Sequence, residues 1–245
     1  MIRIKFTGDI MCGMAQNAAC RTEDGYDYAR IFKKAKKALQ DCDYLVGNLE
    51  MTLSGEALQY SNGPYSFNTP DCFADTIKDV GFDLVSTANN HCMDRGRAGL
   101  ERTLRRLDMM GIPHLGTYRD SAERAEEHPL IVERNGVRLA LLCYTYGTNG
   151  IEVQKPNVVN FIDTLAMARD LRVAREKKAD FVITLIHWGI EYATKANAEQ
   201  ERTARWLLDH GCDAVIGGHP HVVQPMALLT SNEDPEHKTG CIYSL

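Results

Sequence analysis

Two histidines lie two residues apart in the segment GGHPHVV, directly after the apolar run DAVI. In an extended strand, the side chains of His219 and His221 would point to opposite faces, because successive residues alternate. Gly217 and Gly218 precede them and permit unusual backbone dihedrals and close backbone approach. The pattern therefore favours a loop in which both imidazoles converge, and each could serve one metal ion. A polar turn at a strand end is the alternative interpretation.

Four further apolar runs end in side chains that can bind a metal. IRIKFT leads to Asp9, YLVGN to Glu50, FDLVS to Asn90, and FVITLI to His187. Taken singly, such residues are more commonly turn, cap or surface residues. In open α/β sheets, however, ligands bind outside the carboxyl ends of the strands. Five strand ends that each carry a ligand-type side chain therefore predict one shared pocket.

The donor set points to particular metals. Three imidazoles, two carboxylates and one amide suit Zn, Mn or Fe better than Ca or Mg. These donors are more than one tetrahedral ion needs. They could hold two ions about 3.5–4 Å apart, as in two-metal phosphoester hydrolysis, with a shared carboxylate between them.

Short apolar runs alternate with longer amphipathic segments, which is typical of an α/β protein. We expect strands at 2–7, 44–48, 82–86, 139–145, 181–186 and 213–216, and helices at 27–40, 71–79, 97–110, 163–178 and 198–210. The dipeptide Asn135-Gly136 predicts a β-hairpin with a type I′ turn. The segment 51–70 has no clear period and is expected to be a long loop that shapes the pocket.

We expect residues 1–245 to form a single domain. The closing GCIYSL reads as a strand that is only starting, so the domain is expected to be shortened at its C-terminus.

The composition argues against a nucleic-acid-binding, disulfide-rich or membrane-spanning protein. The chain is 44% hydrophobic and 25% charged, with a net charge of −5, so nucleic acid is not expected as a partner. The eight cysteines form no CxxC pair, which favours free thiols in a reducing compartment. There is no signal-peptide pattern and no apolar run of roughly 20 residues. We therefore expect a cytoplasmic chain without a membrane anchor, and its oligomeric state stays open.

Five motifs in a fixed order carry a family resemblance: GDIM (8–11), GNLE (47–50), ANNHCMDRG (88–96), HWGIEY (187–192) and GGHPHVVQP (217–225). Together they resemble the calcineurin-like metallophosphoesterase superfamily, and more closely its bacterial CapA-like branch of poly-γ-glutamate capsule synthesis proteins. The resemblance spans residues 1–245. It implies a four-layer α/β/β/α sandwich with mixed sheets and a dinuclear centre.

The resemblance also implies a role for each site residue. It assigns Asp9 and His221 to the first ion, Glu50 to a bridging position, and Asn90, His187 and His219 to the second ion. His91 would act as general acid or phosphate stabiliser at the leaving group, and Asp94 would orient it. The superfamily usually has a histidine at or near Met11 and an aspartate-rich second motif. Both departures fit the CapA-like branch, and they imply a first ion that is weakly held or absent.

The implied activity is that of a metal-dependent hydrolase in which a hydroxide held by the cations attacks a phosphoester. The alternative is a non-catalytic component of poly-γ-glutamate synthesis or export that binds the polyanionic polymer. A third interpretation is hydrolysis of γ-glutamyl amides, with Arg95 and Arg97 holding substrate carboxylates. Those two arginines also fit exposed charges at the start of a helix. The substrate, a small molecule or a polyanion, is left open.

Overall fold

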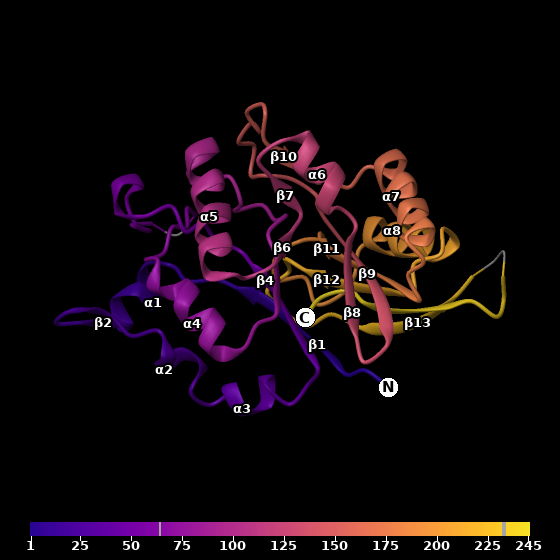
Figure 1. Ribbon diagram of the computed structural model, residues 1–245, viewed down its shortest axis with the longest axis horizontal. Helices are drawn as coiled ribbons and strands as arrows, with labels where there is room; N and C mark the ends of the chain where they lie inside the picture. Colours follow the sequence, from indigo (N-terminus) through magenta and orange to yellow (C-terminus); the bar gives the residue numbers. More distant parts are fainter. Residues whose placement is uncertain (64, 232–233) are drawn as a thin grey trace.

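Two β-sheets packed face to face form the centre of the computed structural model, which describes residues 1–63, 65–231 and 234–245 (Figure 1). The first sheet has four parallel strands in the order β1 (Ile4–Ile10), β4 (Tyr44–Leu49), β5 (Leu84–Ser86) and β6 (His114–Leu115). The second has six strands in the order β13 (Met226–Thr230), β14 (Lys238–Ile242), β12 (Ala214–Gly218), β11 (Phe181–His187), β9 (Val137–Thr145) and β8 (Leu130–Arg134). Its four inner strands are parallel and its two edge strands antiparallel.

Helices cover the outer face of each sheet (Figure 1). On the four-stranded sheet lie α4 (Cys72–Val80) and α5 (Gly96–Met110). On the six-stranded sheet lie α7 (Thr164–Glu176) and α8 (Ala198–Asp209). The expected four-layer α/β/β/α sandwich with mixed sheets is confirmed.

Alternation along the strands explains these layers. In β4, Leu45 packs in the cluster with the helix residue Phe73, whereas the next residue, Val46, packs between the two sheets. In β9, Leu141 packs between the sheets and Leu142 in the cluster under α7 and α8. Strands covered on both faces read as continuous apolar runs, which is why the sequence showed them clearly.

Most predicted elements are confirmed within a few residues, but the helix expected at 27–40 is wrong. The chain forms two short helices there, α2 (Ala29–Phe32) and α3 (Lys36–Leu39), with a turn between them. The run KKAKK contributes to this break, because Lys33 and Lys37 would lie on one face of a continuous helix and repel each other by about 0.2–0.5 kcal/mol.

Other short elements escaped prediction because a few residues show no period: α1 (Met14–Ala19), β2 (Arg21–Thr22), β3 (Gly25–Tyr26), a 3₁₀ turn at Glu56–Leu58, β7 (Thr117–Tyr118), α6 (Ser121–Glu127) and β10 (Val158–Val159). The predicted hairpin joins β8 to β9, and both Asn135 and Gly136 have positive φ, as a type I′ turn requires.

The described residues of the segment 51–70 have little regular structure; residue 64 lies outside the described part. A bridge between Thr52 and Asn68 closes it into a loop. The buried amide of Asn68 accepts a hydrogen bond from the Ser54 N–H and donates to the Gly55 carbonyl. The loop therefore has internal support beside the pocket. Within the described residues, no helix has the length and apolar character needed to cross a membrane.

Candidate metal centre

The carboxyl ends of strands from both sheets meet at one place. Asp9 is the next-to-last residue of β1 and pairs with Asn48 of β4, and His187 ends β11 next to Gly218 of β12. A Cβ atom at Gly218 would lie 2.7 Å from Oδ1 of Asp9, so only glycine lets the two sheets approach this closely here. The backbone N–H of His219 then donates to Asp9 Oδ2 at 3.0 Å. The expected convergence of strand ends is confirmed.

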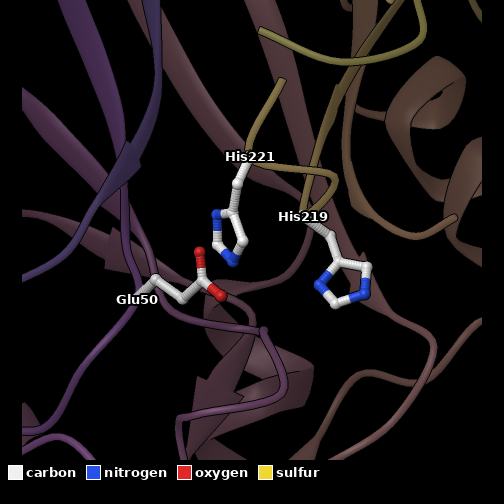
Figure 2. Close-up of side chains that lie close together, drawn as sticks. All are labelled: Glu50, His219 and His221. Carbon is white, nitrogen blue, oxygen red and sulfur yellow. The ribbon is translucent and has the colours of Figure 1, made fainter. Parts of the chain in front are cut away.

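Glu50 lies at the centre of this region and is fully buried. Its carboxylate points toward the imidazoles of His219 and His221 (Figure 2). Its Oε1 also lies 3.3 Å from Nε2 of His187. Neither oxygen has a hydrogen-bond partner of normal geometry among the described residues, and Asp9 lies close enough to interact with the protonated form of Glu50. A buried carboxylate without donors is costly, so its surroundings fit a group that is completed by a cation.

Two sets of three side chains have ligand atoms within 4.8 Å of one another: Asp9, Glu50 and His187, and Glu50, His219 and His221. Glu50 belongs to both sets, as a bridging carboxylate would. The sets divide the remaining residues differently from the assignment that the resemblance implies, which paired Asp9 with His221. Asp9 Oδ2 does lie 3.4 Å from His221 Nδ1, so that pairing stays a prediction that the geometry also permits.

The two carboxylates have opposite electrostatic environments. Burial acts to raise the pKa of Asp9, but the hydrogen bond with His221, the nearby His187 and the amide of Asn48 lower it well below its usual range. Burial and the charge of Asp9 raise the pKa of Glu50 well above its usual range. Asp9 is therefore the permanent charge of the pair, and Glu50 ionises readily only when positive charge is close.

The pKa values of the histidines are also shifted in opposite directions. Burial lowers the pKa of His187 to about 4, and burial together with His187 lowers the pKa of His219 to about 4. Both imidazoles are therefore neutral at pH 7, the form in which histidine binds metal. The hydrogen bond with Asp9 raises the pKa of His221, whose ring is half-buried.

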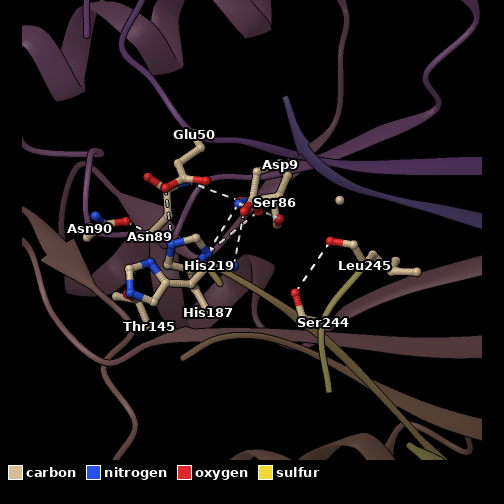
Figure 3. Close-up of polar contacts among 12 residues, drawn as sticks. Asp9, Glu50, Ser86, Asn89, Asn90, Thr145, His187, His219, Ser244 and Leu245 are labelled. Atoms are coloured by element: carbon tan, nitrogen blue, oxygen red, sulfur yellow. Dashed lines mark hydrogen bonds and ion pairs between the residues drawn. The ribbon is translucent and has the colours of Figure 1, made fainter. Parts of the chain in front are cut away.

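Asn90 completes the group from the loop after β5. Its Oδ1 lies 2.8 Å from Nε2 of His187 (Figure 3), and its Nδ2 donates to Oδ1 of Asn149 at 3.2 Å. Asn48 braces the opposite side: its Nδ2 donates to Asp9 at 2.8 Å, and its Oδ1 accepts from Ser86.

His91 and Asp94 are hydrogen-bonded to each other. Nδ1 of His91 lies 2.8 Å from Oδ2 of Asp94, which also accepts the Phe67 N–H at 2.6 Å. The ring of Phe67 packs edge-on against His91 with centroids 4.6 Å apart. These contacts hold the imidazole of His91 in place. Its Nε2 has no hydrogen bond with a described residue and can bind another partner. The orienting geometry predicted for Asp94 is present, and the catalytic role of the pair stays a prediction.

The arginines considered for substrate binding have partners elsewhere. Arg95 donates to the carbonyls of Leu58 and Gln59 and so holds the 51–70 loop. Arg97 pairs with Glu101 at 2.8 Å along α5. The structure therefore gives both arginines a structural contact.

Sequence reasoning missed Tyr146, which directly follows β9. Its ring lies over His187, with centroids 6.3 Å apart, and against His219 at 4.7 Å. Its position at a strand end on the same edge of the sheet was the signal that could have found it. Asn149 lies three residues further in the same loop, and no motif marked it.

Comparison with known proteins shows the family of this chain. Residues 3–245 match the family described as Bacterial capsule synthesis protein PGA_cap. The chain belongs to this family. It is 28% identical over 242 residues to the PGA biosynthesis protein CapA of Bacillus subtilis (strain 168), covering 92% of this chain and 59% of that one. It is 27% identical over 233 residues to the capsule biosynthesis protein CapA of Bacillus anthracis, covering 91% and 55%. This PGA_cap chain thus spans little more than half the length of these relatives.

A solved structure shares the fold. The NAD nucleotidase of Haemophilus influenzae superposes with a TM-score of 0.53 at 16% identity, covering 88% of this chain and 39% of that one. The PGA_cap chain therefore shares the fold of this nucleotidase.

Proposed function

We propose that this PGA_cap chain is a metal-dependent hydrolase that acts on a phosphoester in capsule biosynthesis. The observation that carries the proposal is Glu50, a fully buried carboxylate that faces three imidazoles. Neither of its oxygens makes a hydrogen bond of normal geometry with a described residue. A divalent cation would satisfy both of its oxygens and offset the cost of burying its charge.

The donor set supports two divalent ions of the Mn, Zn or Fe type. Imidazole with carboxylate and amide oxygen suits these metals. Glu50 belongs to both sets of ligand atoms, which supports a shared carboxylate between two positions. The residues that would hold the ions are Asp9, Glu50, Asn90, His187, His219 and His221. The missing histidine near Met11 leaves the first position with fewer ligands, so we expect it to bind more weakly.

When bound, the cations supply a water molecule activated at neutral pH and offset the charge that develops on the phosphoryl oxygens. The protein's own part is positioning and proton transfer. His91, held at Nδ1 by Asp94, presents Nε2 to the leaving oxygen as hydrogen-bond donor or general acid. Because their pKa values are lowered to about 4, His187 and His219 are neutral at pH 7, the form in which an imidazole can bind a metal.

The substrate is proposed from the family. The Bacillus subtilis relative is a PGA biosynthesis protein, which favours a substrate connected with poly-γ-glutamate. The amide-hydrolase interpretation relied on Arg95 and Arg97, and their structural contacts give it no support. A non-catalytic polymer-binding role predicts binding of poly-γ-glutamate without turnover of a phosphoester.

The test is turnover of bis(p-nitrophenyl) phosphate with Mn²⁺. We expect wild-type turnover to be lost in His187→Ala, which removes a ligand. In His91→Ala we expect it to fall by about 10²–10⁴-fold, the range for loss of a general acid. His210→Ala, an exposed histidine that stacks on Trp206, is the matched control and should match wild type. Binding of poly-γ-glutamate without any turnover would contradict the hydrolase proposal and favour the polymer-binding role.

A further inference from the structure

The loop that follows β9, residues 146–150, contacts the candidate ligands from the six-stranded sheet side. The backbone N–H of Tyr146 donates to the His187 carbonyl at 3.0 Å, so this loop is fixed to the strand end that carries a ligand. Asn149 is the loop residue whose side chain reaches Asn90. We propose that Asn149 is a positioning residue that determines which atom of Asn90 faces the cations. This inference rests on the proposed function.

An asparagine amide has two chemically different ends. Its oxygen can bind a cation, whereas its NH₂ group is a donor only and cannot. The terminal torsion of asparagine is broad and roughly two-fold, so rotation exchanges the two ends at little cost. Asn90 is 1% exposed, so solvent does not decide between them. A protein group must therefore hold the amide with its oxygen inward.

Asn149 supplies that group. Nδ2 of Asn90 donates to Oδ1 of Asn149 at 3.2 Å, and this is its hydrogen-bond acceptor among the described residues. With Nδ2 turned toward the loop, Oδ1 of Asn90 lies 2.8 Å from Nε2 of His187, on the side of the candidate ligands. The contact thus connects an exposed loop residue to the orientation of a buried ligand.

The backbone places Asn149 for this contact. Its φ is 51°, in the left-handed region that asparagine tolerates better than most residues, and Gly150 follows with φ 76°. The hydroxyl of Thr148 donates to the Ile151 carbonyl at 2.6 Å and closes the turn. The loop is therefore shaped so that a short amide side chain projects toward Asn90.

Calorimetric titration of the cation-free protein with Mn²⁺ tests the proposal. Asn149→Gly removes the acceptor without straining the positive φ, and we expect the affinity for Mn²⁺ to fall by about tenfold, the lower end for loss of a group that orients a ligand. Asn149→Asp keeps an acceptor and is expected to rescue binding. The thermal midpoint of the cation-free Asn149→Gly variant should fall by only about 2–4 °C, because the variant loses one hydrogen bond of a buried amide and no packing of the core.

The same substitution in an Asn90→Asp variant separates an effect on the orientation of residue 90 from a general loss of structure at the site. In Asn90→Asp both terminal atoms are oxygens, so the orientation no longer matters. Asn149→Gly should then change the Mn²⁺ affinity by no more than about twofold, the limit for independent sites. The inference is overturned if Asn149→Gly lowers the Mn²⁺ affinity equally in wild type and in the Asn90→Asp variant, or if it does not lower it in wild type.

The two proposals fail differently. If wild type binds Mn²⁺, His187→Ala does not, and Asn149→Gly binds like wild type, only the role of Asn149 is wrong. If His187→Ala binds Mn²⁺ as well as wild type does, the metal centre itself is wrong, and the positioning role falls with it.

Discussion

At the scale of single residues, we expect Glu50 to lower the stability of the cation-free protein and to strengthen cation binding. Glu50 is completely buried beside Asp9, a second carboxylate that keeps its charge. Its pKa is raised by burial and by that charge. Such an arrangement is unfavourable for the fold unless a cation completes it, and carboxylates with perturbed pKa values are common at functional sites.

The raised pKa gives a definite pH dependence. Native Glu50 holds a proton that the unfolded chain releases above its ordinary pKa of 4.5. Its contribution to stability is therefore fully present below that pH and is lost as the pH rises toward the raised value. Asp9 has the opposite slope, because its pKa is lowered, and its contribution is lost as the pH falls.

We predict that Glu50→Gln stabilises the cation-free protein. At pH 7 with a chelator present, the free energy of unfolding should rise by about 1–3 kcal/mol, the cost of an uncompensated buried polar group. At pH 4 the difference should shrink, and Mn²⁺ affinity should fall at every pH. Urea unfolding at the two pH values measures this, with the exposed Glu23→Gln as control. A cation-free Glu50→Gln variant less stable than wild type at pH 7 would be incompatible with this account.

The residues that sequence reasoning found and missed differ in one respect. Asp9, Glu50, Asn90 and His187 follow strands whose apolar runs are clear, so their placement at one edge could be predicted. Asn149 acts through a hydrogen bond from a loop of left-handed backbone, and neither feature leaves a periodic signal. Which ligands group around each ion also depends on side-chain directions that strand order does not specify.

At the scale of elements, β12 delivers His219 and His221 because its last two residues have no side chains. A Cβ atom at Gly217 would lie 2.1 Å from the Tyr243 carbonyl oxygen and 2.6 Å from the Trp188 indole nitrogen. After these glycines, His219 and His221 have φ of 100° and 56°, so the chain turns sharply and both rings converge. The role of these glycines could be predicted from the sequence. The break between α2 and α3 could not, and only the structure shows it.

We predict that Gly217→Ala destabilises the fold even without cations. Overpacking of this kind costs typically about 1–3 kcal/mol of unfolding free energy. Gly240→Ala in the neighbouring strand β14 is the matched control, because a Cβ there meets no atom within 4 Å. Thermal unfolding of both variants decides the matter: equal midpoints for the two would show that the close approach at β12 is unimportant.

At the scale of the whole molecule, the candidate ligands come from both sheets. Asp9 lies in the four-stranded sheet, and Glu50 directly follows its strand β4. His187 lies in the six-stranded sheet, and His219 and His221 follow its strand β12. A cation held by both groups would connect the two halves of the sandwich. We propose accordingly that residues 1–245 unfold as one domain.

Cation binding should therefore raise the stability of the entire chain. At a free Mn²⁺ concentration of 100 times the dissociation constant, binding to the native state alone adds about 2.7 kcal/mol per site. We expect one calorimetric transition whose midpoint rises with Mn²⁺ in wild type and stays constant in His187→Ala. Two separate transitions, of which only one responds to Mn²⁺, would contradict a centre shared by both sheets.

The most direct test of the metal centre is the metal content of the protein itself. Elemental analysis of wild type purified without chelator should find about two transition-metal ions per chain, or one where the weaker position is empty. The same analysis of Glu50→Gln should find clearly less. A wild-type content far below one ion per chain, unchanged by the substitution, would contradict the account.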